Sequence, residues 1–173
     1  MIRRFLIAGL VAGLVAATGL IATPARAAGD PPFITVGLGG IGVLADREKA
    51  GVVHFEYRSD WEFWKVRPFI GAFASTDATL YGYFGFKVDL FLGRRIVITP
   101  NVAVGAYEDG DGQDLGHVIE FRSGMELAWR FDDRSRLGIA VHHLSNASIG
   151  SDNPGTEEVV LFYSLPLNSL FGD

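Results

Sequence analysis

The chain has 173 residues, a formal net charge of −5 and no cysteine. An acidic chain is poorly suited to bind nucleic acid, whose phosphates require a basic face. The lack of cysteine excludes disulfide bonds and a thiolate metal site, and the spacing of the four histidines suggests no other metal site.

The first 27 residues are typical of a secretory signal peptide. Arg3 and Arg4 precede an apolar run from Phe5 to Ala22, and small residues two apart end the segment at Ala25-Arg26-Ala27. A single-span anchor is the alternative. Removal of the signal peptide leaves residues 28–173, which we expect to form one domain, because a chain of this size normally has a single core. No later apolar run approaches the length of a transmembrane helix.

Residues 28–173 are predicted to form eight β-strands. Glycines recur inside apolar alternating stretches, which disfavours helices, and turn residues separate the segments. Most segments are much longer than strands of soluble proteins and match the roughly 9 to 11 residues that a tilted strand needs to cross a membrane. An even number of long strands is typical of an antiparallel outer-membrane β-barrel. The predicted strands are residues 33–44, 50–59, 64–75, 79–91, 95–107, 117–131, 136–147 and 157–168.

Alternation within these strands supports a closed barrel. In segment 117–131, apolar residues from Ile119 to Phe131 share one parity, whereas Glu120, Arg122, Glu126 and Arg130 share the other. A soluble sandwich would turn the charged face to water outside, but an eight-stranded barrel turns it inward, where the charges pair. Aromatic residues near strand ends favour the membrane barrel, because amphipathic rings prefer the headgroup level. They are Tyr57, Trp61, Trp64, Tyr107, Trp129 and Tyr163.

Loop lengths predict the orientation of this barrel. If the N-terminus lies in the periplasm, the connections at 45–49, 108–116 and 148–156 face the outside of the cell. The connections at 92–94 and 132–135 are then short periplasmic turns.

Three polar residues interrupt apolar stripes at the external ends of the last two strands. His143 and Ser145 continue the parity of Val141, and Glu157 shares the parity of Val159. Polar groups on a lipid-facing stripe are costly unless they lie at the headgroup boundary or have a function. Because the two strands are antiparallel neighbours, these side chains should lie side by side. Ordinary interface residues are the alternative interpretation.

Serine, histidine and glutamate together form the set needed for nucleophilic ester hydrolysis. The imidazole takes the proton of the serine hydroxyl, and the carboxylate orients the imidazole and stabilises its charged form. Asn146 and Asn153 are the nearby side-chain amides that could stabilise the oxyanion or position the substrate, and backbone amides of the loop 147–155 are the alternative donors. His142 has the opposite parity to His143, and we expect its side chain in the lumen.

These residues also carry a family resemblance. The stretch His143-Leu144-Ser145-Asn146-Ala147, then Asn153-Pro154-Gly155-Thr156-Glu157 and a final apolar strand, resembles the lipid A 3-O-deacylase (PagL) family. The pattern of that family is His-x-Ser-Asn, with a glutamate twelve residues after the serine, although Ser148 stands where the family often has glycine. The resemblance implies an outer-membrane barrel with Ser145 as nucleophile, His143 as general base and Glu157 as orienting acid, without a cofactor.

The resemblance also implies a substrate and a location. It predicts hydrolysis of the ester-linked 3-hydroxyacyl chain at the 3-position of lipid A, with lipopolysaccharide as partner. The active site would face the outer leaflet of the bacterial outer membrane. A monomer and a homodimer are both compatible with the sequence. The alternatives are a non-catalytic small barrel, structural or adhesive, and a barrel esterase that acts on phospholipid.

Overall fold

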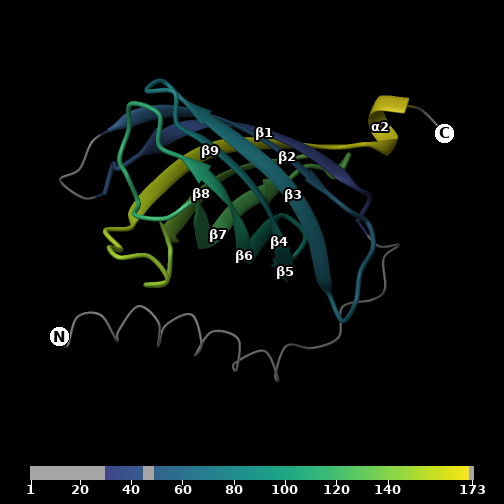
Figure 1. Cartoon of the computed structure of the whole chain (residues 1–173). Coiled ribbons are helices and arrows are strands. Elements are labelled where there is room, and N and C mark those ends of the chain that lie inside the picture. The colour runs from purple at the N-terminus through teal and green to yellow at the C-terminus, as the bar shows by residue number, and fades with distance from the viewer. Residues whose placement is uncertain (1–29, 45–48, 172–173) are drawn as a thin grey trace.

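The protein is one antiparallel sheet closed into a barrel in a computed structural model that describes residues 30–44 and 49–171 (Figure 1). Each strand pairs with the next one along the chain, except that β4 and β5 both pair with β6, and β1 pairs with β9 to close the barrel. The predicted signal peptide, residues 1–27, lies outside the described residues. The elements are β1 (Phe33–Ile41), β2 (Ala50–Arg58), β3 (Val66–Ser75), β4 (Leu80–Val88), β5 (Leu90–Leu92), β6 (Ile96–Glu108), β7 (Ile119–Arg130), β8 (Arg136–Ser145), β9 (Thr156–Pro166) and α2 (Asn168–Phe171).

The nine assigned strands make eight crossings, because β4 and β5 are two parts of one strand interrupted at Asp89. Both parts pair with β6. The Asp89 carboxylate lies in the lumen, where it accepts hydrogen bonds from Arg58 (2.6 Å), Arg136 (2.7 Å) and the Thr99 hydroxyl (2.8 Å). The predicted eight-stranded antiparallel barrel is therefore confirmed, with a break in its fourth strand that the alternation pattern does not show.

Charged side chains face the lumen and apolar side chains face outward, as predicted. Buried ionisable groups come from most of the strands, and most of them are paired, which offsets the cost of desolvation. Among the described residues, Glu120 is an exception, because both of its carboxylate oxygens are buried without a hydrogen-bond partner. Lys87 contacts Glu56 and lies 2.8 Å from Glu126. The exposed apolar side chains form an outer wall suited to hydrocarbon; they include Phe55, Ile70, Phe84, Leu127, Ile139 and Leu161.

One aromatic residue departs from the expected interfacial positions. Tyr107 is buried in the lumen, and its hydroxyl donates to the carbonyl of Gln113 at 2.9 Å. The prediction that Tyr107 belongs to an interfacial girdle is therefore wrong, because its parity on β6 is that of the inward residue Val97. Trp61, Trp64 and Trp129 are exposed near strand ends, in agreement with the prediction.

The long connections gather at one end of the barrel. The β6–β7 and β8–β9 connections lie at the left in Figure 1, opposite the end where α2 lies. Within the described ranges, no helix is long and apolar enough to cross a membrane.

Candidate active site

Strands β8 and β9 place His143 and Glu157 directly opposite each other. They are cross-strand partners in the register, and His143 Nδ1 lies 3.7 Å from Glu157 Oε1. The side chains are 45% and 28% exposed, respectively, so both can be reached from the outer wall. Ser145, the last residue of β8, lies two positions beyond His143 and therefore on the same face. The three residues predicted to act together thus share one outward patch.

The contacts within this patch are longer than hydrogen bonds. The separation of His143 and Glu157 allows ionic attraction but exceeds the 2.7–3.2 Å of an N–H···O bond. In the described part of the chain, no hydrogen bond joins the Ser145 hydroxyl to His143, and Glu157 Oε2 is buried without a partner. Catalytic hydrogen bonds are often long before substrate binds and shorten in the complex, so this geometry is compatible with a resting triad.

The register also identifies the surroundings of the patch. Phe121 on β7 lies opposite Ser145, and Ser123 lies opposite His143. Toward the middle of the strands the next outward pair is Met125 and Val141. The patch is therefore a polar row at the loop end of the wall, with an apolar surface beneath it.

Asn146 organises the loop that follows Ser145. It is fully buried, and its side-chain nitrogen donates to the carbonyls of Leu115 (2.8 Å) and Asp152 (2.7 Å). Its side-chain oxygen accepts from the backbone N–H of Ser148 at 2.9 Å. Both amide hydrogens are thus already used, which leaves Asn146 without a side-chain donor for a substrate.

Asn153 differs from Asn146 in which atoms of its side-chain amide are already hydrogen-bonded. Its side-chain oxygen accepts from the backbone N–H of Asn146 at 3.0 Å, which fixes the side chain. Its nitrogen makes one long contact, 3.4 Å, to the Ser148 hydroxyl. Of the two asparagines, Asn153 therefore has the available N–H donors.

The backbone after Ser145 turns through two left-handed residues. Ala147 and Ser148 have φ angles of 54° and 66°, a region that favours glycine over residues with a side chain. Gly155, with a φ of 62°, closes the same loop beside the site. A Cβ at position 155 would lie 3.0 Å from His143 Cε1, so a side chain there would crowd the imidazole.

The β6–β7 connection supports the β8–β9 connection, a relation that the sequence analysis missed. Leu115 is buried beneath the loops, and Gln113 donates from its side chain to the carbonyl of Gly155 at 3.3 Å. At Gly116, with a φ of 85°, a Cβ would lie only 2.5 Å from the carbonyl oxygen of Asp152. The two loops therefore touch backbone to backbone. No sequence pattern links these segments, because the contact depends on barrel closure.

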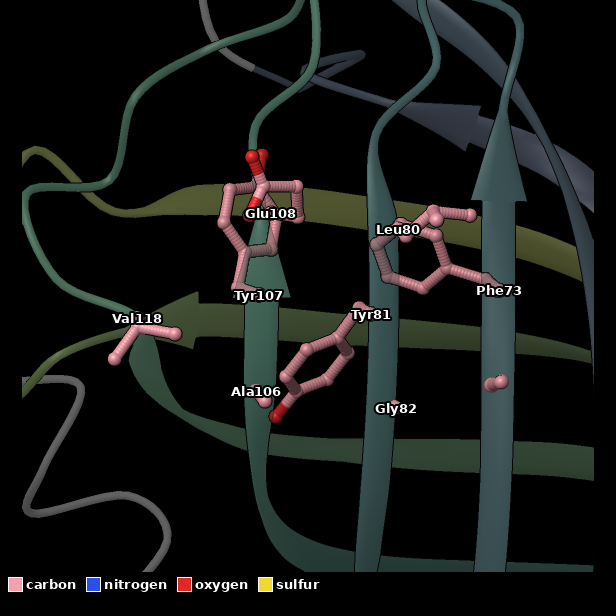
Figure 2. Close-up of a pocket in the computed structure, with 9 residues that line it drawn as sticks. Phe73, Leu80, Tyr81, Gly82, Ala106, Tyr107, Glu108 and Val118 are labelled. Carbon is pink, nitrogen blue, oxygen red and sulfur yellow. The ribbon is translucent and has the colours of Figure 1, made fainter.

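Hollows elsewhere on the wall do not coincide with the triad. Two shallow ones, of about 310 and 410 Å³, lie side by side over β3, β4 and β6. Figure 2 shows the smaller hollow. Its lining includes the small residues Gly82 and Ala106 together with the large side chain of Tyr81. Glu108 is the charged residue of that lining. The described residues that line this hollow include no serine or histidine to act with that carboxylate, so the patch on β8 and β9 is the better candidate.

Ser123 is the nearby polar residue that the sequence analysis did not single out. It shares the parity of Phe121 and Met125 on the apolar stripe of β7. Ser123 is thus a polar residue within an apolar stripe, as His143 and Ser145 are on β8. The same parity test would have found it, and the register places it beside the site.

The fold and this patch define a class: a small β-barrel of the transmembrane type, whose candidate active site lies on the outer wall rather than in the lumen. The model of a family described as lipid A 3-O-deacylase (PagL) matches residues 43–166, well over half of the chain. The chain belongs to this family.

Individual relatives agree with this assignment. Lipid A deacylase PagL of Pseudomonas aeruginosa is 27% identical over 118 residues, which cover 68% of this chain and 51% of that protein. The match thus spans about half the length of this relative.

Two solved structures share the fold. The crystal structure of the outer membrane enzyme PagL has a TM-score of 0.61 at 22% identity, covering 78% of this chain and 99% of the other. A de novo designed transmembrane β-barrel has a TM-score of 0.57 at 10% identity, covering 81% and 98%. At these identities the structures support the barrel fold alone.

Proposed function

We propose that this protein is an outer-membrane serine esterase that removes the ester-linked 3-hydroxyacyl chain from the 3-position of lipid A. The observation that carries the proposal is the cross-strand pairing of His143 with Glu157 on the outer wall, with Ser145 next on the same face. Family membership supplies the substrate class. The outward direction of the patch suits a substrate whose acyl chains lie alongside the barrel.

The proposed reaction begins with attack on the ester carbonyl. Ser145 Oγ forms a bond to the carbonyl carbon while His143 takes its proton, and Glu157 stabilises the resulting imidazolium. The tetrahedral intermediate collapses, the bond to the sugar oxygen breaks, and His143 returns the proton to that oxygen. Water, deprotonated by His143, then hydrolyses the acyl-Ser145 ester and releases the fatty acid.

The oxyanion needs donors on the loop side of Ser145. The Asn153 amide is our candidate, because its oxygen is anchored by the Asn146 backbone while its nitrogen has only a long contact. We assign Asn146 to positioning the loop, since its own donors already bind two carbonyls. One well-placed donor is worth roughly 3 kcal/mol of transition-state stabilisation.

The membrane setting follows from the same geometry. The triad lies at the loop end of the wall, which the predicted topology places at the outer leaflet, where lipid A resides. The headgroup then reaches the loops, and the acyl chain lies along the apolar surface of Met125 and Val141. One chain supplies the whole proposed triad, so the mechanism requires no second copy.

Release of fatty acid from purified lipid A by the refolded barrel tests the proposal. We expect the wild type to release a 3-hydroxy fatty acid, Ser145→Ala to release none above background, and Glu157→Gln to be slower by at least roughly 100-fold. Ser151→Ala, at an exposed position of the same loop, is the matched control and should retain activity. Release from phospholipid vesicles alone would favour the phospholipid esterase, and a folded but inactive wild type would favour a structural barrel.

A further inference from the structure

Ser123 places an unpaired hydroxyl on the outer wall beside the proposed base. It lies opposite His143 on β8, on the side away from Glu157, and opposite Val102 on β6. Its outward neighbours along β7, Phe121 and Met125, are both exposed. Within the described ranges, the Ser123 hydroxyl takes part in no hydrogen bond, so its donor and acceptor are available to a ligand.

An unpaired hydroxyl is unfavourable on a wall that faces hydrocarbon. Moving a hydroxyl from water to an apolar environment without a partner costs about 1–3 kcal/mol on protein mutational scales. The outward residues around Ser123 are of two kinds. Val102 and Met125 are apolar, and His143 belongs to the proposed triad. A hydrogen-bonding group on the bound lipid would supply the missing partner.

The depth of Ser123 identifies which part of the lipid it meets. Ser145 ends β8 at the loop end of the barrel, whereas Ser123 and His143 lie one outward row closer to the middle of the strands. When the ester carbonyl lies at Ser145, the sugar points toward the loops and the acyl chain runs along the strands. Ser123 therefore meets the acyl chain close to its ester end rather than the sugar.

The distance suits a substituent on the third carbon of that chain. Ser123 is the diagonal cross-strand neighbour of Ser145, because Ser145 lies opposite Phe121. Diagonal neighbours lie about 7–8 Å apart at their Cα atoms, and their side chains are closer. The third carbon is two bonds beyond the carbonyl carbon that Ser145 attacks, so a hydroxyl there fits between the two serines.

We propose that Ser123 hydrogen-bonds the hydroxyl on the third carbon of the acyl chain and thereby selects 3-hydroxyacyl esters over unsubstituted ones. This role rests on the proposed esterase function and goes beyond it, because the triad alone does not distinguish these acyl groups. Ser123 is a substrate-recognition residue that takes no part in the proton transfers. Its removal should change the choice of substrate more than the rate of the chemical step.

The test compares two p-nitrophenyl esters, of 3-hydroxytetradecanoic acid and of tetradecanoic acid, with the full refolded barrel in detergent micelles. We expect the wild type to prefer the hydroxylated ester in kcat/KM by roughly tenfold, the typical effect of one hydrogen bond. Ser123→Ala should reduce this ratio to about one, and Ser123→Thr, which keeps the hydroxyl, should retain most of it. Val102→Ala, in the same row one strand away, is the control and should keep the wild-type ratio.

The outcomes separate this inference from the function on which it rests. Hydrolysis of both esters by the wild type, abolished in Ser145→Ala, supports the esterase whatever Ser123 does. If that activity is present but the ratio is one in the wild type, or is unchanged in Ser123→Ala, the role of Ser123 is overturned while the esterase stands. A folded wild type that hydrolyses neither ester and no lipid A overturns both.

Discussion

Ser148 adopts a backbone conformation that its side chain does not favour. Its φ of 66° follows that of Ala147, also positive, and its N–H donates to Asn146. We expect Ser148→Gly to keep or raise esterase activity, because glycine adopts this conformation without strain. Ser148→Val should add further strain and lower kcat/KM several-fold, because β-branched residues tolerate this conformation less well than serine does. Steady-state hydrolysis by the two variants checks this, and an active Val variant beside an inactive Gly variant would contradict it.

The residues of the site were predictable where their parity was informative. His143, Ser145 and Glu157 each break an apolar stripe, and the structure brings them to one patch. The lumen position of His142 was likewise predicted correctly from its parity. The different hydrogen-bond partners of Asn146 and Asn153 were not predictable. The side chain of Asn146 binds carbonyls of Leu115 and of the folded loop, which come close only in the closed barrel.

At the scale of elements, the contact between the β6–β7 and β8–β9 connections holds the loop that follows Ser145. Gly116→Ala would place a Cβ 2.5 Å from the Asp152 carbonyl, the same carbonyl that accepts from Asn146. We therefore expect the loop to shift and kcat/KM to fall roughly tenfold, which corresponds to about 1.4 kcal/mol of lost transition-state stabilisation. The barrel itself should still fold, as judged by its heat-dependent mobility in detergent gels.

Gly93→Ala is the matched control for this substitution. Gly93 also has a positive φ, 68°, but a Cβ there would meet no atom within 4 Å, and the residue lies in the turn at the opposite end of the barrel. The Gly93→Ala variant therefore has alanine at a positive φ, as Gly116→Ala does, but its Cβ makes no contact with a second loop. Equal losses of activity in the two variants would show that strain, rather than the loop contact, determines the result.

The strand pattern was predictable at this scale because alternation reports which face each residue occupies. The break at Asp89 was not predictable, whereas the inward position of Tyr107 follows from its parity. Asp89 interrupts its strand where its carboxylate meets arginines from β2 and β8, which the local sequence does not encode. Tyr107 was assigned to the interface from its residue type and its place near a strand end, but it shares the parity of the inward residue Val97 on the same strand.

For the whole molecule, the paired charges of the lumen stabilise the closed barrel. Asp89 contacts both Arg58 and Arg136, and all three side chains are buried. Asp89→Asn should lower the free energy of unfolding by about 3 kcal/mol, because it leaves buried positive charge uncompensated. Urea unfolding in lipid vesicles measures this effect.

Asp132→Asn is the corresponding control outside the lumen. Asp132 pairs with Arg95 at 2.8 Å, but its side chain is 78% exposed, and such surface pairs contribute at most about 1 kcal/mol. We expect a small effect from this substitution. A loss of stability as large as that of Asp89→Asn would contradict the assignment of stability to the lumen pairs.

The central claim is that Ser145 on the outer wall deacylates lipid A. Tandem mass spectrometry of lipid A incubated with the refolded wild type and with Ser145→Ala tests it most directly, because the fragments locate the lost chain. We predict that the wild type alone removes one 3-hydroxyacyl group, from the 3-position. Unchanged lipid A with a wild type shown to be folded, or equal loss with Ser145→Ala, would contradict the account.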